Sequence, residues 1–95
     1  MTVHWTRTAL RQLTRIHEHI AEDSTTHARG MVDRLTRRSA QIAQFPTSGR
    51  AVPEYEDDDV REMFEGSYRI IYRILPERID VLAVIHMARR LPRRR

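Results

Sequence analysis

The sequence has no cysteine and no lysine. Without cysteine, neither a disulfide framework nor a thiolate zinc site can form. Because all 17 basic residues are arginine, no lysine side chain can serve as a general acid or base. No apolar run approaches the roughly 20 residues that a membrane-spanning helix needs, and the opening segment, MTVHWTRTAL, lacks the hydrophobic region of a signal peptide. We therefore expect a cytoplasmic protein that does not enter a membrane.

The chain is short and basic. Its 95 residues leave room for one hydrophobic core, so we expect a single domain over residues 1–95. The formal net charge is +4. The planar guanidinium of arginine binds carboxylates and phosphates through paired hydrogen bonds. The composition is therefore suited to an acidic partner or a nucleic acid.

Two helices are predicted in the first half of the chain, after a short strand at Thr2–Trp5. Thr6 or Thr8 can cap the first helix, whose apolar residues recur at helical spacing: Leu10, Leu13, Ile16 and Ile20. The second helix is predicted over residues 26–44, with one apolar stripe formed by Ala28, Met31, Val32, Leu35 and Ile42. The short polar turn between the helices predicts an antiparallel helical hairpin.

Three strands are predicted after a loop rich in proline and charge at residues 46–59. The strands span residues 60–65, 68–75 and 78–86. Gly66 and Ser67 are a hairpin turn signal between the first two strands, and Pro76 and Glu77 lie in the next turn. The predicted order is β-α-α-β-β-β, which is an α+β domain.

The strand at residues 68–75 alternates apolar and basic side chains, and successive side chains of a strand point to opposite faces. We expect Arg69 and Arg73 to lie on an open face of the sheet. The opposite face is expected to pack on the helices through Tyr68, Ile70, Tyr72 and Ile74. The two arginines are either solvated or paired side chains, or part of an anion-binding surface.

Few other residues could carry chemistry. His86 at the end of the last strand is the main titratable candidate, and a packed or hydrogen-bonded histidine is the alternative. His17 and His19 are only two positions apart on a helix and make no metal-binding pair. The acidic run at residues 54–59 lacks the glycine and glutamate spacing of a calcium loop, which favours a solvated loop. We predict no metal and no cofactor.

Four segments, in this order and at this chain length, are similar to a known family. They are FPTSGRAVPE after the second helix, VRE at the start of the next strand, YRIIYRI, and the closing IDVLAVIHMARRL. Through them the chain resembles the RelE/ParE superfamily of bacterial type II toxins over nearly all of its length. The resemblance implies a helical hairpin packed on a curved antiparallel sheet, and a cognate antitoxin that silences the toxin. Oligomers are expected only through the antitoxin complex.

RelE-like members of this superfamily cleave messenger RNA on the ribosome with basic residues. For such an endoribonuclease, the resemblance would assign catalysis to Arg69, His86 and Arg89. The lysines that RelE-like enzymes place on the preceding strand are absent here, where that strand begins VREM, and so is the C-terminal tyrosine of some members. RNA cleavage needs a base for the 2′-hydroxyl and an acid for the leaving oxygen. These absences disfavour the nuclease.

ParE-like members end similarly, with a histidine and arginines after the last strand, as in VLAVIHMARRL. They poison DNA gyrase and need no catalytic residues of their own. We therefore predict a ParE-like gyrase inhibitor, with contacts to its target or to nucleic acid through Arg61, Arg69, Arg73, Arg89 and Arg90. Whether the protein is an enzyme stays open: it is not if it is ParE-like, and it is an endoribonuclease if it is RelE-like. The alternatives are a RelE-like nuclease acting on ribosome-bound messenger RNA and a non-catalytic nucleic-acid-binding module. For residues 89–95, a flexible tail and a contact with an acidic partner or nucleic acid are both open.

Overall fold

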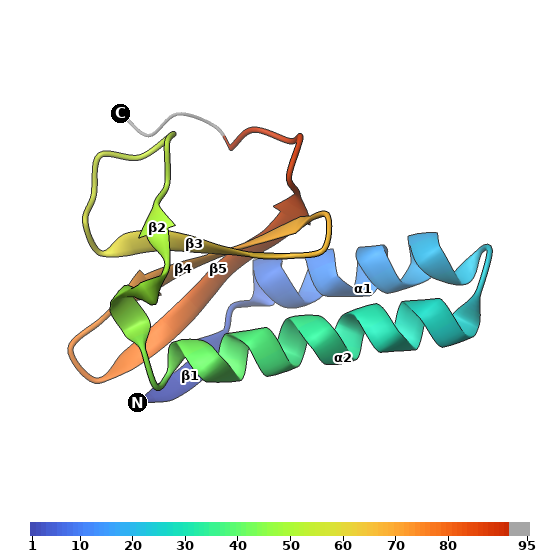
Figure 1. Cartoon of the computed structure of the whole chain (residues 1–95), viewed down its shortest axis with the longest axis horizontal. Helices are drawn as coiled ribbons and strands as arrows, with labels where there is room; N and C mark the ends of the chain where they lie inside the picture. The colour runs from blue at the N-terminus through green and yellow to red at the C-terminus, as the bar shows by residue number, and fades with distance from the viewer. Residues whose placement is uncertain (92–95) are drawn as a thin grey trace.

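The structure is a computed structural model that describes residues 1–91. In chain order its elements are β1 (Thr2–Trp5), α1 (Arg7–Ala21), α2 (Thr25–Ile42), the 3₁₀ turn η1 (Pro46–Ser48), β2 (Arg50–Ala51), β3 (Val60–Glu65), β4 (Tyr68–Ile74) and β5 (Arg78–His86) (Figure 1). The predicted order of one strand, two helices and three strands is confirmed. The short strand β2 was not predicted, and positions 92–95 of the predicted tail lie outside the described residues.

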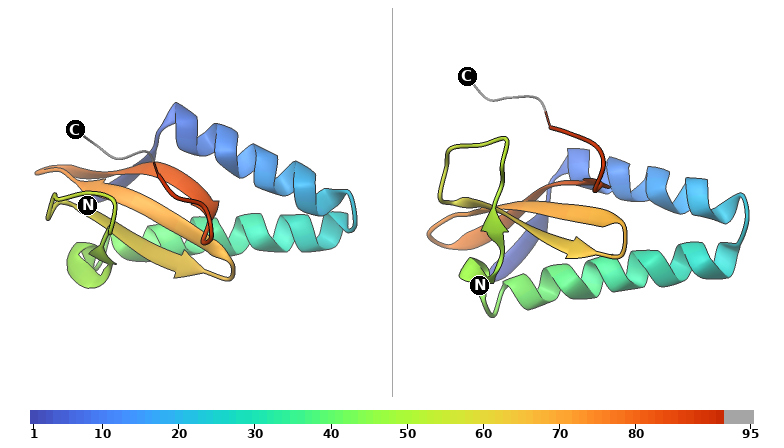
Figure 2. Two further views of the ribbon diagram at one scale, coloured as in Figure 1. Left: turned by 90° about the horizontal axis from the view of Figure 1, so that it is seen from above. Right: turned by 45° about the horizontal axis from the view of Figure 1, so that its top comes forward.

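The two helices run antiparallel and together cover one face of a five-stranded sheet (Figures 1 and 2). The strand order is β1-β5-β4-β3-β2. The pairs from β5 to β2 are antiparallel, whereas β1 pairs parallel to β5. The α+β fold is confirmed, and the sheet is mixed rather than wholly antiparallel. A parallel pair requires a long connection, and the chain between β1 and β5 comprises the helical hairpin and the strands β2, β3 and β4.

Side-chain caps determine where both helices begin. The hydroxyl of Thr6 accepts a hydrogen bond from the Ala9 N–H at 3.2 Å, and the hydroxyl of Ser24 accepts one from the His27 N–H at 3.1 Å. The second helix therefore begins one residue earlier than predicted and ends at Ile42. Neither of the helices in the described part of the chain is long and apolar enough to cross a membrane.

The apolar stripe of α1 differs from the prediction at its first position. Leu10 is 51% exposed, whereas Ala9 is fully buried. The stripe that faces the sheet is Ala9, Leu13, Ile16 and Ile20. The short side chain of Ala9 allows the first turn of α1 to lie close to β5, where the Thr6 N–H donates to the Val81 carbonyl at 3.1 Å.

The main core lies between the helices and the sheet. Ile70 and Tyr72 of β4 are fully buried there, and Tyr68 and Ile74 pack against the same cluster. Their buried neighbours from β5 and the helices include Ile79, Val81, Val84, Leu35 and Ile42. The predicted helix-facing side of this strand is therefore confirmed.

The opposite face of the sheet is not open, and the prediction of an uncovered face is wrong. The loop between β2 and β3 and Leu91 at the end of the described chain pack against it (Figure 1). The buried members of this second cluster are Val52, Val60, Ile71, Ala83 and Ile85. Because the sheet presents apolar side chains on both faces, covering the second face removes them from water and stabilises the fold.

A bulge in β5 changes which of its side chains face each cluster. Ile71 pairs with Ala83, but the next residue, Tyr72, pairs with Val81, so that Leu82 has no partner on β4. Strict alternation would place Val81 on the same face as Ala83. The extra residue reverses the alternation and turns Val81 into the main core, while Ala83 stays in the second cluster.

Gly49 joins the loop after α2 to the core. Its N–H donates to the Tyr72 hydroxyl at 3.1 Å, and that hydroxyl donates to the Pro46 carbonyl at 2.6 Å. A Cβ at this position would meet the Tyr72 hydroxyl and would lie 2.8 Å from the Glu62 carbonyl oxygen. The glycine of the FPTSGR segment is therefore required by close packing.

We expect Gly49→Ala to lower the free energy of unfolding by about 1–3 kcal/mol, the usual cost of overpacking a core. Gly30→Ala is the matched control. Its Cβ would meet only an Arg34 guanidinium nitrogen at 3.8 Å, and alanine stabilises a helix interior by about 1 kcal/mol relative to glycine. Urea denaturation should therefore move the two midpoints in opposite directions. A Gly49→Ala variant as stable as the wild type would contradict the packing.

Candidate functional site

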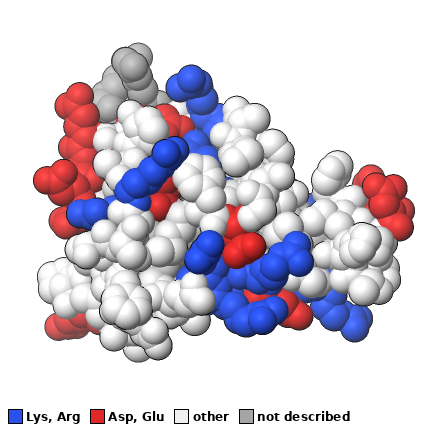
Figure 3. Space-filling view, in the orientation of Figure 1, with Lys and Arg blue, Asp and Glu red and all other residues white. Residues whose placement is uncertain are grey.

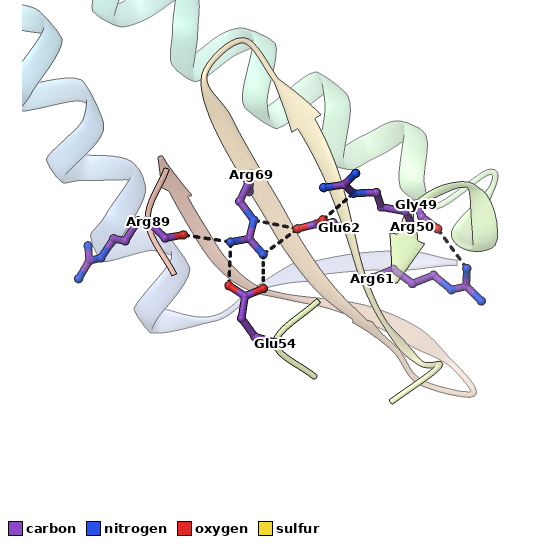
Figure 4. Close-up of polar contacts among 7 residues, drawn as sticks. All are labelled: Gly49, Arg50, Glu54, Arg61, Glu62, Arg69 and Arg89. Carbon is purple, nitrogen blue, oxygen red and sulfur yellow. Dashed lines mark hydrogen bonds and ion pairs between the residues drawn. The ribbon is translucent and has the colours of Figure 1, made fainter. Parts of the chain in front are cut away.

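Arg69 of β4 lies at the centre of a buried polar cluster on the sheet face away from the helices (Figure 4). The residue is 5% exposed. Its Nε donates to Glu62 at 2.8 Å, and its two terminal nitrogens each donate to the Glu54 carboxylate at 2.9 Å. Nη1 also donates to the Arg89 carbonyl at 3.0 Å. The expectation that Arg69 lies on an open face is therefore wrong.

Glu62 of β3 joins two arginines of different exposure. The residue is 1% exposed, and its second carboxylate oxygen accepts from Arg50 Nε at 2.7 Å. The Arg50 side chain is 65% exposed, and its guanidinium lies 4.7 Å from the centre of the Phe64 ring. Glu62 thus connects the buried guanidinium of Arg69 to an exposed one at the surface.

Glu54 reaches the cluster from the loop between β2 and β3. Its side chain is 7% exposed, and it accepts from the Leu91 N–H at 2.9 Å as well as from Arg69. The hydrogen bonds from Arg69 lower the pKa of Glu54 to about 2, although burial opposes this shift. The same bonds raise the pKa of Arg69, again against the effect of burial. The pair is therefore ionised at neutral pH.

The acidic run at residues 54–59 is only partly the solvated loop that the sequence indicated: Glu56, Asp58 and Asp59 are exposed, whereas two of its carboxylates are paired. Glu54 is buried in its ion pair, and Asp57 accepts from Arg73 Nη1 at 2.9 Å. The loop is thus tied to β4 at two points, Arg69 and Arg73. The Arg73 side chain remains 26% exposed.

The lowered pKa of Glu54 predicts a loss of stability in acid. Its folded pKa of about 2 lies below the ordinary value of 4.5, so its ionisation stabilises the fold above pH 4.5 and this contribution is lost as the pH falls towards 2. The loss from Glu54 amounts to about 3 kcal/mol. Glu54→Gln should remove this part of the pH dependence, and Glu77→Gln, at an exposed position, should retain it. Thermal unfolding over this pH range checks the prediction, and equal pH slopes for all three proteins would contradict it.

A pocket of about 300 Å³ lies beside the cluster. Its walls include Arg50, Phe64, Met87, Arg89 and Arg90, and its carboxylates belong to Glu54 and Glu62. With Arg69, four arginines line the pocket against these two carboxylates, and Arg50 and Arg69 pair with them while Arg89 and Arg90 are exposed. The pocket is therefore cationic. In the space-filling view, basic side chains lie among acidic ones over the strands and gather more densely over α2 (Figure 3).

Arg61, another predicted contact residue, lies on the helix side of the sheet. It stands opposite Tyr72 in the register of β3 and β4. Its Nη1 donates to the carbonyls of Gly49 at 3.0 Å and Thr47 at 3.3 Å, so it holds the η1 loop. Arg89 and Arg90 are exposed, as their predicted role requires, and a role as target contacts stays a prediction.

The three residues named for RNA cleavage do not converge. His86 pairs with Tyr68 in the sheet and lies against its ring edge to face at 5.8 Å, on the helix side. Arg69 lies on the other face, where it is buried between carboxylates. Arg89 meets it only through the main-chain carbonyl. The side chains of His86 and Arg69 are therefore separated by the sheet itself.

Sequence reasoning missed Arg50, Glu54 and Glu62. The sequence did contain a signal for Glu62. Glu62 and Val60 share one face of β3, just as Arg69 and Ile71 share one face of β4, so opposite charges lie among apolar residues on one face of the β3–β4 hairpin. No comparable signal marks Glu54, which lies in an irregular loop. Within residues 1–91, no group of three or more side chains is placed to hold a metal ion.

Two solved structures from toxin–antitoxin systems share this fold. A chain of the chromosomal ParDE system from P. aeruginosa matches with a TM-score of 0.74 and 21% identity, covering 90% of this chain and 95% of that one. A chain of the toxin–antitoxin complex RelBE2 (Rv2865-2866) from Mycobacterium tuberculosis matches with a TM-score of 0.65 and 24% identity at the same coverage. The fold is therefore of the RelE/ParE class.

Comparison of the sequence with protein-family models identifies the family within this fold class. The family model described as ParE toxin of type II toxin-antitoxin system, parDE, matches residues 3–91. The chain belongs to the ParE toxin family. A comparison with curated proteins finds no significant match. The resemblance to the RelE/ParE superfamily, with the ParE-like branch favoured, is thus confirmed.

Proposed function

We propose that this toxin inhibits DNA gyrase and that a cognate antitoxin neutralises it. The observation that carries the proposal is the arrangement of the arginines. Arg50, Arg89 and Arg90 are exposed around one pocket, where they can contact another protein. A toxin that traps an enzyme needs contact groups of this kind, and it needs no acid or base of its own.

The arrangement is poorly suited to RNA cleavage. The proton-transfer candidate, His86, lies on the helix side of the sheet, and the basic candidate, Arg69, is paired on the other side. A guanidinium already bound to two carboxylates has no free fork for a phosphate. These features favour gyrase over ribosome-bound messenger RNA as the target.

An antitoxin partner fits the same surface. The ParDE and RelBE2 structures are toxin–antitoxin systems, and in this chain the exposed Met87 lies beside Arg89 and Arg90 at the pocket. An acidic and apolar antitoxin segment would associate quickly through charge and dissociate slowly through apolar contacts. Co-purification with the product of the neighbouring gene tests this part. A toxin that stays monomeric beside that product would contradict it.

The gyrase assay tests the target. Purified toxin with gyrase, ATP and plasmid should accumulate cleaved DNA. Arg89→Ala should weaken this effect strongly, and Arg89→Lys partly, because lysine keeps the charge and loses the fork. Arg29→Ala is the matched control, since Arg29 is exposed on α2 and outside the pocket.

Two outcomes would overturn the proposal. Cleavage of messenger RNA in a purified translation mixture, with gyrase unaffected, would establish the nuclease. Strongly salt-dependent binding to plasmid DNA alone, again with gyrase unaffected, would establish a nucleic-acid-binding module.

A further inference from the structure

We propose that Glu54 and Arg69 form a clasp that positions the C-terminal segment, residues 87–91, so that Arg50, Arg89 and Arg90 line a pocket that takes an acidic side chain of a partner protein. The physical case for the clasp stands on its own contacts. Its link to toxicity rests on the proposed function.

The clasp holds the C-terminal segment by its main chain. Arg69 donates to the Arg89 carbonyl at 3.0 Å (Figure 4). Glu54 accepts from the Leu91 N–H at 2.9 Å. These two bonds lie on either side of Arg90. Because both are made to backbone groups, they determine the path of the chain and leave the side chains of Arg89 and Arg90 available to a partner.

The start of the segment is held independently. The Met87 N–H donates to the Ser67 carbonyl at 2.7 Å, and the Arg89 N–H donates to the His86 carbonyl at 2.9 Å. Leu91 packs on the second cluster. The segment is therefore tied to the sheet at both ends, and only the far end depends on the clasp.

The segment forms one wall of the pocket, and β2 and β3 form the other. Met87, Ala88, Arg89 and Arg90 line the first wall, and the exposed Arg50 over Phe64 belongs to the second. Glu54 and Glu62 lie between the walls, and the clasp and Arg50 neutralise them. If the clasp opens, the first wall is no longer held beside Arg50 and the pocket loses its shape.

The pocket favours a protein carboxylate over a nucleic-acid backbone. A polyphosphate chain is bound by a continuous run of cations, whereas here two carboxylates and apolar side chains lie between the arginines. A single acidic side chain can pair with an arginine fork, and its apolar neighbours can pack on Phe64 and Met87. The occupant is therefore an acidic segment with apolar residues.

The first experiment measures the clasp without any partner. Hydrogen exchange at the Leu91 amide should accelerate about tenfold or more in Glu54→Gln, since a bond to a charged acceptor is lost. Arg69→Lys should act similarly, because one ammonium cannot reach both Glu54 and the Arg89 carbonyl. Asp57→Asn is the matched control: the Asp57–Arg73 pair ties the same loop to the same strand at 2.9 Å. Unchanged exchange at Leu91 in both clasp variants would overturn the clasp.

The second experiment measures the pocket. A short peptide of alternating glutamate and leucine should bind the wild type and Asp57→Asn, and should shift the NMR signals of the Arg50, Arg89 and Arg90 side chains. Glu54→Gln should bind it several-fold more weakly. Tighter binding of single-stranded DNA than of the peptide at equal ionic strength would overturn the assigned occupant.

The two experiments separate the inference from the proposed function. If gyrase is unaffected but peptide binding depends on the clasp, the target is wrong and the pocket stands. If gyrase is inhibited equally by the wild type and Glu54→Gln, while Arg89→Ala is inactive, the target stands and the clasp has no part in toxicity.

Discussion

Replacing Arg69 by methionine will lower the free energy of unfolding by about 3–5 kcal/mol, the usual cost of removing one partner from a buried ion pair. The substitution leaves two carboxylates in the sheet without their main partner, because the side chains of Glu54 and Glu62 are 7% and 0% exposed. Glu62 retains Arg50 and Glu54 retains the Leu91 N–H. Neither bond replaces the guanidinium that lay between them.

The control for this result is Arg73→Met on the same strand. The Arg73–Asp57 pair has a similar length, 2.9 Å, but its side chains are 26% and 32% exposed. Exposed ion pairs contribute about 0–1 kcal/mol. Urea denaturation of the two variants should therefore separate them clearly. Equal losses would mean that burial does not govern the energetics of these arginines.

A further variant tests the mechanism of the loss. If unpaired buried charge is the cause, adding Glu54→Gln and Glu62→Gln to Arg69→Met should restore much of the stability, because no buried charge then remains in the cluster and Arg50, which loses Glu62, is exposed. A triple variant less stable than Arg69→Met alone would indicate that lost packing, rather than unpaired charge, dominates.

Replacing Tyr72 by alanine will cost a similar amount, about 3–5 kcal/mol, for a different reason. The residue is fully buried in the main core, so truncation leaves a cavity. Its hydroxyl also links Pro46 and Gly49, which would lose their partner. Burial raises the pKa of this phenol, as expected for a neutral group held among apolar side chains.

One variant isolates the contribution of the Tyr72 hydroxyl, and a second serves as the control on the other face of β4. Tyr72→Phe keeps the ring and removes the hydroxyl, and it should cost about 1–2 kcal/mol, because the Gly49 N–H loses its acceptor. Arg73→Ala, at the next position on the strand, should cost about 0–1 kcal/mol. Chemical denaturation measures all three. A loss for Arg73→Ala as large as that for Tyr72→Ala would mean that the two faces of β4 are exchanged.

The elements that could be predicted are those whose pattern is local. Strand β4 shows period two within seven residues, so its helix-facing side follows from Tyr68, Ile70, Tyr72 and Ile74 alone. The helices were predicted in the same way from the period of 3.6 residues. The first position of the α1 stripe was assigned to Leu10, whereas the buried residue is its neighbour Ala9, because helical periodicity does not distinguish adjacent positions at the edge of a stripe. Local pattern determines which elements form, and only approximately where they end.

The partners of the charged residues could not be predicted in this way. Arg69 and Glu54 are 15 positions apart, and Glu54 and Leu91 are 37 positions apart. A strand pattern states which face Arg69 occupies but not what covers that face. The bulge at Leu82 could not be predicted either. It changes which β5 side chains point to each face of the sheet, but the apolar run VLAVI shows no break at that position.

The sequence by itself determined the absence of thiol and lysine chemistry, the order of the helices and main strands, the buried side of β4 and the resemblance to RelE/ParE toxins. Only the tertiary structure decided that both faces of the sheet are covered, that Arg69 is buried with Glu54 and Glu62, and that His86 lies on the opposite face. The physical reason is that composition and periodicity act within one element, whereas a buried charge depends on the distant segments that fold over it.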